Sequence, residues 1–204
     1  MMSTMEPISH TVVVPSRRQF LRSVSKVTLS ASAIALLVGR EAMAASKSKP
    51  MAANPAQDVS ILNVALGLEH EAIGAYQIGA ESGLLEKSVL DVAVLFQSQH
   101  KGHRDALVKA VHKLGGVPVK SKSLQEYMAA LQVASLKNQR DVLTLAARLE
   151  RGAANAYLGV IPSFADPALA QVAGRLAADE TMHWTVLAQA LGQPLPTNAL
   201  SFGA

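Results

Sequence analysis

The sequence predicts an all-α protein, an antiparallel bundle of four long helices. Three observations support this prediction. Apolar residues recur three and four positions apart along four segments, each about 22 to 29 residues long. The alternation of apolar and polar residues that is typical of a strand is never sustained. Glycine and proline residues lie between the four segments, where helices are expected to end.

The first helix is expected over Asp58–Glu81, with Asp58 as its N-cap and Gly83 just beyond its end. The second is expected over Glu86–Leu114 and ends at the glycine pair that follows. One long crossover then leads to the second half of the bundle. The elements expected there are, in order, a loop (115–123), a short helical segment (Leu124–Val133), a third long helix (Ser135–Val160) and a fourth helix. The fourth has Asp166 as its N-cap and Pro167 at its first position, and it ends at Gly192.

The composition fits one domain with an additional segment. The chain has 204 residues, of which 50% are hydrophobic, and its formal net charge is +4. It has no cysteine, which excludes a disulfide framework, a thiolate zinc site and a thiol nucleophile. Aromatic residues make up only 4%, which argues against a surface that stacks nucleic-acid bases.

The N-terminus has the layout of an export signal. A basic segment precedes a short apolar run, Val27–Val38, and a small-residue site at 42–44 where cleavage between Ala44 and Ala45 is expected. The run is too short for a permanent transmembrane anchor, which needs about 20 apolar residues. The stretch S-R-R-Q-F-L-R resembles the twin-arginine signal and contains its characteristic residues, Arg17, Arg18, Phe20 and Leu21. This resemblance implies the twin-arginine translocon as a partner and the periplasm or the exterior as the destination.

We therefore divide the chain into a signal peptide (1–44), a linker (45–57), the helical bundle (58–192) and a C-terminal tail (193–204). The signal holds five basic and two acidic residues, which leaves 14 basic and 13 acidic residues in the mature part. The basic balance belongs mostly to the signal. With no basic stripe left for phosphates, nucleic acid is not expected as a partner.

The two halves of the bundle repeat each other. The pattern L-E-x-x-A-x-x-A-Y occurs around Glu69 and again around Glu150. About thirty residues after each copy, a pair of polar residues with i, i+3 spacing follows in the next helix. A repeated helical hairpin predicts a pseudo-two-fold bundle with these groups near its centre. The two pairs are His100 with His103, and Glu180 with His183.

All six of these polar residues fall on the apolar stripes that face the core. Buried carboxylates without a partner are costly, and three of them at the same depth repel one another. A divalent metal ion between them would supply the missing positive charge. The sequence therefore predicts a metal site with these ligands: Glu69, His100, His103, Glu150, Glu180 and His183.

With these residues in place, the stretch from about Val59 to Leu191 resembles the ferritin-like four-helix bundle, in particular the ferritin-like domains of twin-arginine-exported bacterial proteins. The family's di-iron pattern has one Glu from each of two helices and a Glu-x-x-His from each of the other two. By resemblance, Glu69 and Glu150 match the single carboxylates. Glu180 and His183 form an intact Glu-x-x-His, whereas His100 occupies the position of the other glutamate.

The replacement at His100 removes a carboxylate that commonly bridges two metals in the family. Two Fe or Mn ions, an unequal pair, one Fe, Mn or Zn ion, and a site that has lost its metal all stay open. His70 and Glu71 flank Glu69 as alternative ligands, although Glu71 lies off the stripe. The two tyrosines Tyr76 and Tyr157 lie two turns beyond Glu69 and Glu150, where they either pack in the core or orient a ligand.

Two classes of function follow. The resemblance implies redox chemistry on Fe²⁺, O₂ or peroxide, and whether the protein is an enzyme stays open. The alternative is a non-catalytic envelope bundle with a degenerate or mononuclear site. Iron storage in a 24-chain shell is less favoured, because no interface can be read in the sequence and the export signal is unusual for a cytosolic store. Whether the chain forms a homo-oligomer stays open.

Overall fold

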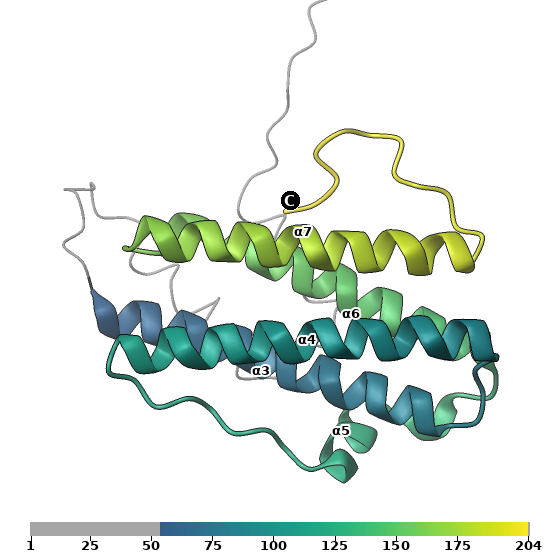
Figure 1. Cartoon of the computed structure of the whole chain (residues 1–204). Helices are drawn as coiled ribbons and strands as arrows, with labels where there is room; N and C mark the ends of the chain where they lie inside the picture. Colours follow the sequence, from purple (N-terminus) through teal and green to yellow (C-terminus); the bar gives the residue numbers. More distant parts are fainter. Residues whose placement is uncertain (1–53, 204) are drawn as a thin grey trace, which may run out of the picture.

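The computed structural model describes residues 54–203, and within them every regular element is a helix. The N-terminal signal, its cleavage site and most of the linker lie outside the described residues. Four long helices lie side by side (Figure 1), and shorter elements connect them. The long helices are α3 (Pro55–Glu81), α4 (Lys87–Lys113), α6 (Gln139–Val160) and α7 (Pro167–Ala190), and the short elements are α5 (Leu124–Ala130) and the 3₁₀ turns η1 (Val133–Ser135) and η2 (Ile161–Ser163).

The bundle consists of two antiparallel hairpins, α3–α4 and α6–α7, in agreement with the predicted repeat. The crossover that carries α5 runs back along the bundle, so that α4 and α6 point the same way (Figure 1). The predicted all-α bundle with one long crossover is confirmed. Among the described helices, none has an apolar stretch sufficient to cross a membrane.

The first helix begins earlier than the sequence predicts. Its N-cap is Asn54, whose side chain accepts a hydrogen bond from the Gln57 N–H, and Pro55 is its first residue. The prediction of Asp58 as N-cap is wrong. Asp58 is buried, and its carboxylate accepts the N–H groups of Ala165 and Asp166 at 3.1 and 3.3 Å. It therefore ties the start of α3 to the start of α7.

The third helix begins later than predicted, at Gln139 with Asn138 as its N-cap, because the turn η1 occupies the positions before it. The short segment is split, since α5 ends at Ala130 and Gln132 takes a left-handed φ of 55°. The predicted cap of the fourth helix is confirmed: Asp166 accepts the Ala168 N–H at 2.8 Å.

The crossover is seated on α3 by Tyr127, a buried residue of α5. Its ring lies over Gly74, where an added Cβ atom would come within 2.7 Å of the ring. A side chain at this position would push the crossover away. Gly74 therefore allows α5 to cover the outer face of α3.

The core has two large apolar clusters, one toward each end of the bundle, and a smaller one beneath the crossover around Tyr127. The first centres on residues such as Leu62, Leu107 and Leu176, and the second on Phe96, Trp184 and Leu187. Apart from Asp58 at the start of α3, the buried charged residues of the long helices lie between the two large clusters. They are shielded from water at both ends of the bundle by close-packed side chains.

Candidate metal centre

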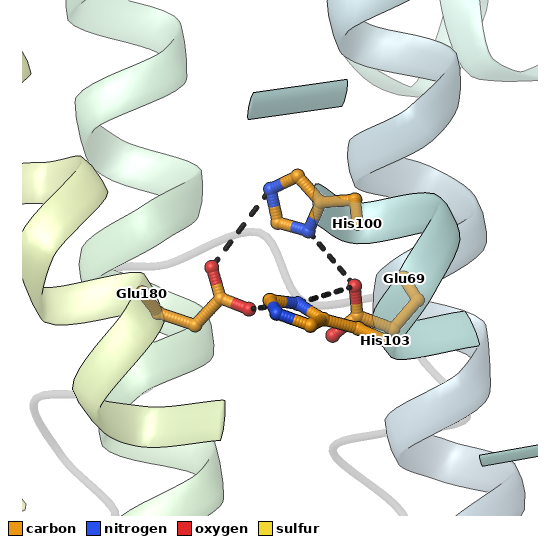
Figure 2. Close-up of side chains that lie close together, drawn as sticks. All are labelled: Glu69, His100, His103 and Glu180. Carbon is orange, nitrogen blue, oxygen red and sulfur yellow. Dashed lines mark hydrogen bonds and ion pairs between the residues drawn. The ribbon is translucent and has the colours of Figure 1, made fainter. Parts of the chain in front are cut away.

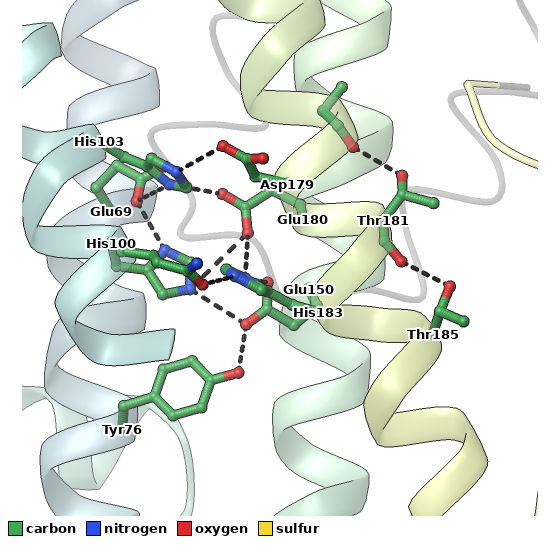
Figure 3. Close-up of polar contacts among 12 residues, drawn as sticks. Glu69, Tyr76, His100, His103, Glu150, Asp179, Glu180, Thr181, His183 and Thr185 are labelled. Atoms are coloured by element: carbon green, nitrogen blue, oxygen red, sulfur yellow. Dashed lines mark hydrogen bonds and ion pairs between the residues drawn. The ribbon is translucent and has the colours of Figure 1, made fainter. Parts of the chain in front are cut away.

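Six ionisable side chains meet at mid-length of the bundle, and they are the six that the sequence predicts. Each long helix contributes from its inward stripe: α3 and α6 one glutamate each, and α4 and α7 an i, i+3 pair. Five of them are at most 2% exposed, and the sixth, His103, is 11% exposed. Figure 3 shows them converging from the four helices. The residues are Glu69, His100, His103, Glu150, Glu180 and His183.

His100 lies at the centre of the cluster. Its Nδ1 is 2.8 Å from Glu69 Oε2, and its Nε2 is 3.1 Å from Glu150 Oε1. Nε2 is also 3.8 Å from Glu180 Oε2. One imidazole therefore connects the carboxylates of three helices.

The other two histidines stand on either side of Glu180. His103 Nδ1 is 3.2 Å from Glu180 Oε1 and 3.5 Å from Glu69 Oε2. His183 Nδ1 is 3.2 Å from Glu180 Oε2 and 3.4 Å from Glu150 Oε2. Both side chains thus point the same ring nitrogen, Nδ1, toward the carboxylates.

Two overlapping groups of four residues have the geometry of a cation site. The first combines Glu69 and His103 with His100 and Glu180 (Figure 2), and the second adds Glu150 and His183 to the same shared pair. Within each group the donor atoms lie within 4.8 Å of one another. The shared pair, His100 and Glu180, occupies equivalent positions in the two halves of the repeat.

The two tyrosines reach across the bundle in a reciprocal way. The Tyr76 hydroxyl on α3 donates to Glu150 on α6, and the Tyr157 hydroxyl on α6 donates to Glu69 on α3. Both tyrosines are buried in the core with their hydroxyls bonded to a neighbour, as the first expectation has it, and orientation of a metal ligand stays a prediction. Each hydroxyl holds one carboxylate oxygen, so it fixes the direction in which the other oxygen points.

A second reciprocal pair was missed by the sequence reasoning. The Nε2–H of His103 donates to Asp179 at 3.2 Å, and the Nε2–H of His183 donates to Gln99 at 2.7 Å. In the neutral form of each imidazole, these contacts would leave the Nδ1 lone pair directed inward. A signal was present in the sequence, because Gln99 and Asp179 directly precede the inward pairs of the two halves.

The cluster is held together by strong electrostatic coupling. Burial alone would lower the pKa of His100, but hydrogen bonds to Glu150 and Glu69 outweigh it and raise the pKa well above its ordinary value. For His103 the adjacent carboxylates of Glu180 and Glu69 likewise outweigh burial and raise its pKa to about 10.

The carboxylates respond unequally. Burial would raise the pKa of both Glu69 and Glu150, but hydrogen bonds, first of all from His100, hold each pKa below its ordinary value. For Glu180 burial prevails, helped by the nearby Glu150, and its pKa is raised. Burial, followed by the carboxylates nearby, raises the pKa of Tyr76 and Tyr157 well above the ordinary value, so both hydroxyls stay protonated donors.

The donor set fits a divalent transition metal. Imidazole nitrogen together with carboxylate oxygen suits Fe, Mn or Zn. Two buried atoms, His103 Nδ1 and Glu180 Oε1, have no hydrogen-bond partner in the described part of the chain although they are only 3.2 Å apart. Buried polar atoms are rarely left unpaired, and a shared cation would satisfy both.

Within residues 54–203, the other two histidines and Glu71 lie outside the cluster. His70 Nε2 contacts the Val119 carbonyl at 3.2 Å, so the alternative role of His70 as a ligand is not supported. Glu71 is half-buried, and burial raises its pKa against the opposing effect of Lys122 and Arg148. His112 is exposed in the last turn of α4.

Comparison with known proteins agrees with this architecture. The sequence model of the ferritin-like domain family matches residues 57–193. The chain belongs to this family. The ferritin-like bundle is also similar in fold to the crystal structure of a conserved hypothetical protein from Mycobacterium tuberculosis, with a TM-score of 0.59 and 23% identity over 71% of this chain and 97% of that chain. The comparison with curated proteins found no match.

Proposed function

We propose that this ferritin-like protein binds one or two Fe or Mn ions at the six-residue cluster and carries out redox chemistry on Fe²⁺, O₂ or peroxide. The observation that carries the proposal is the pair of overlapping four-residue groups, buried at mid-bundle and joined by His100 and Glu180. When bound, Fe or Mn supplies one-electron redox chemistry that no side chain of the cluster provides.

The number of ions depends on charge. The three glutamates carry three negative charges, which outweigh one divalent ion and fall one short of two. Each bound ion displaces protons, because His100 cannot serve as a ligand while both of its ring nitrogens carry hydrogen. A second ion therefore requires an added anion such as hydroxide, whereas a single ion does not.

The surrounding residues orient the ligands and exclude water. Asp179 and Gln99 keep the Nδ1 atoms of His103 and His183 directed inward, as outer hydrogen bonds to metal-binding histidines generally do. Phe96 stacks on the His183 ring at 4.0 Å and covers the cluster on one side. Only the side of His103 is partly open to solvent.

One observation favours the alternative, a non-catalytic bundle. His100 already bonds two carboxylates in the structure at 2.8 and 3.1 Å, so part of the cluster is satisfied by protons alone. In that case His100 and its partners act as buried ion pairs, and adding metal leaves the thermal stability unchanged.

The rate of Fe²⁺ oxidation decides between these functions. Metal-free mature protein is mixed anaerobically with Fe²⁺ and then exposed to O₂ or peroxide, and Fe³⁺ formation is followed by absorbance. We expect oxidation faster than in buffer, its loss in Glu180→Ala, and its retention in Glu81→Ala, which removes an exposed glutamate at the end of α3. A rate equal to that in buffer refutes the redox function.

We further propose that the protein is exported by the twin-arginine pathway and cleaved after Ala44. The support is the arrangement of Arg17 and Arg18 before an apolar run and a small-residue site. Replacing both arginines by lysine is expected to retain the precursor inside the cell, whereas Arg22→Lys, which matches the usual signal pattern, is tolerated. Mass spectrometry should show that the exported chain begins at Ala45. Unchanged export of the variant with both arginines replaced refutes the twin-arginine pathway.

A further inference from the structure

An apolar cavity of about 140 Å³ lies beside the charged cluster, between the long helices and the end of the crossover. Among its lining residues are Phe96, Leu143, Ala146 and Leu187. Only two lining residues, Tyr76 and Ser88, carry a polar side-chain group. The cavity is partly open at its rim, where Ser88, Val186 and Ala190 are exposed, so a small apolar molecule can enter it from solvent.

Water is a poor occupant of this cavity. An ordered buried water needs two to four polar partners. The Tyr76 hydroxyl is already engaged, because it donates to Glu150, and Figure 3 shows it turned toward the cluster. The lining offers no second buried polar side chain, since Ser88 is exposed.

The size and walls of the cavity suit one aromatic ring. A cavity of about 150 Å³ lined by Leu, Ile and Phe in another protein stays dry and binds benzene. Here Tyr76 and Phe96 meet edge to face, with ring centroids 6.1 Å apart and planes at 87°. Aromatic walls of this kind offer both a ring face and a ring edge to an aromatic ligand.

We propose that this cavity is a binding site for a small aromatic hydrocarbon of the size of benzene or toluene. The site lies on the Tyr76 side of the cluster, whereas the partly exposed His103 and its partner Asp179 lie on the opposite side (Figure 3). A ring held there contacts Tyr76 and Phe96, and through them it adjoins Glu150 and His183. The proposal does not depend on metal binding, because none of the lining residues belongs to the six-residue cluster.

Binding of toluene to the mature chain is measured by titration calorimetry, with and without EDTA treatment. We expect one toluene per chain. Ala146→Leu, which fills the cavity, is expected to weaken binding at least tenfold, while Ala168→Leu, a matched change on the exposed first turn of α7, leaves it unchanged. Absence of binding to the unaltered protein, or equal binding by Ala146→Leu, overturns the proposal.

A second measurement covers the case in which Ala146→Leu fails to fold. Crystals of the unaltered protein under xenon pressure are expected to show xenon among Phe96, Leu143 and Leu187, and xenon only elsewhere overturns the proposal. The outcomes also separate this site from the metal centre. Toluene binding by a protein that takes up no metal refutes the proposed function and leaves the cavity site standing.

Discussion

Removing the Tyr157 hydroxyl is predicted to destabilise the metal-free protein more than removing either of two other tyrosine hydroxyls. Tyr157 is 2% exposed and donates to Oε1 of Glu69, which is 1% exposed. That oxygen has no other hydrogen-bond partner among the described residues, because His100 binds the second oxygen, Oε2. A hydrogen bond to a charged group contributes about 1.5–3 kcal/mol, so we expect Tyr157→Phe to cost about 2–3 kcal/mol. For a domain of this size, that lowers Tm by about 4–12 °C.

Tyr76→Phe and Tyr127→Phe are the matched controls. Glu150 Oε1 keeps His100 Nε2 at 3.1 Å after Tyr76 loses its hydroxyl, so we expect a smaller loss of about 1–2 kcal/mol. The Tyr127 hydroxyl accepts only the Lys122 N–H at 3.1 Å and a contact with Ser121, which predicts about 0.5–1.5 kcal/mol. Calorimetry in EDTA measures all three. A Tyr157→Phe protein as stable as Tyr127→Phe refutes the reasoning.

Three further predictions concern the ligands. Asp179→Ala should weaken the affinity for metal about tenfold, because the His103 ring loses the contact that orients it. Titration with Mn²⁺ measures the change. An unaltered affinity would show that Asp179 does not orient His103. His100→Glu should raise the metal content to about two ions per chain, because it adds a fourth carboxylate. Without metal it should lower Tm, because the four buried carboxylates repel one another. Elemental analysis and calorimetry test these changes, and an unchanged metal content would contradict the prediction. In EDTA, Tm should fall as pH rises from about 6.5 to about 10. The pKa of His103 in the folded protein is about 10, above its ordinary value of 6.5, so the protonated imidazole stabilises the fold. This contribution is fully present below pH 6.5 and is lost as His103 deprotonates toward pH 10. A Tm that rises over this interval would contradict the assigned ion pairs.

Much of the fold was predictable because periodicity and helix-ending residues act locally. The N-cap that was predicted wrongly, Asp58, depends on contacts with a distant part of the chain. Asp58 has the residue type and position of an N-cap, but its carboxylate serves backbone groups 107 and 108 residues away, and Asn54 caps the helix instead. The late start of α6 is local in origin, since Val133–Ser135 form the turn η1 and Asn138 caps the helix.

The six residues of the cluster were predictable because they interrupt apolar stripes at matching depth in both halves of the repeat. Their outer partners were not found, because Gln99 and Asp179 have the types of ordinary surface residues and only the fold brings each of them to a histidine of the other hairpin. The role of His100 was only partly predictable. The resemblance to the family implies a lost carboxylate at this position, whereas the structure shows an imidazole that connects three carboxylates.

The metal content of the mature chain tests the central claim most directly. Protein purified anaerobically and dialysed against Fe²⁺, Mn²⁺ or Zn²⁺ is measured by elemental analysis, beside Glu180→Ala and the surface control Glu81→Ala, after circular dichroism has shown that all three are folded. We predict about one or two ions per chain in the unaltered protein and in Glu81→Ala, and almost none in Glu180→Ala. No metal in the unaltered protein, or equal metal in folded Glu180→Ala, contradicts the account.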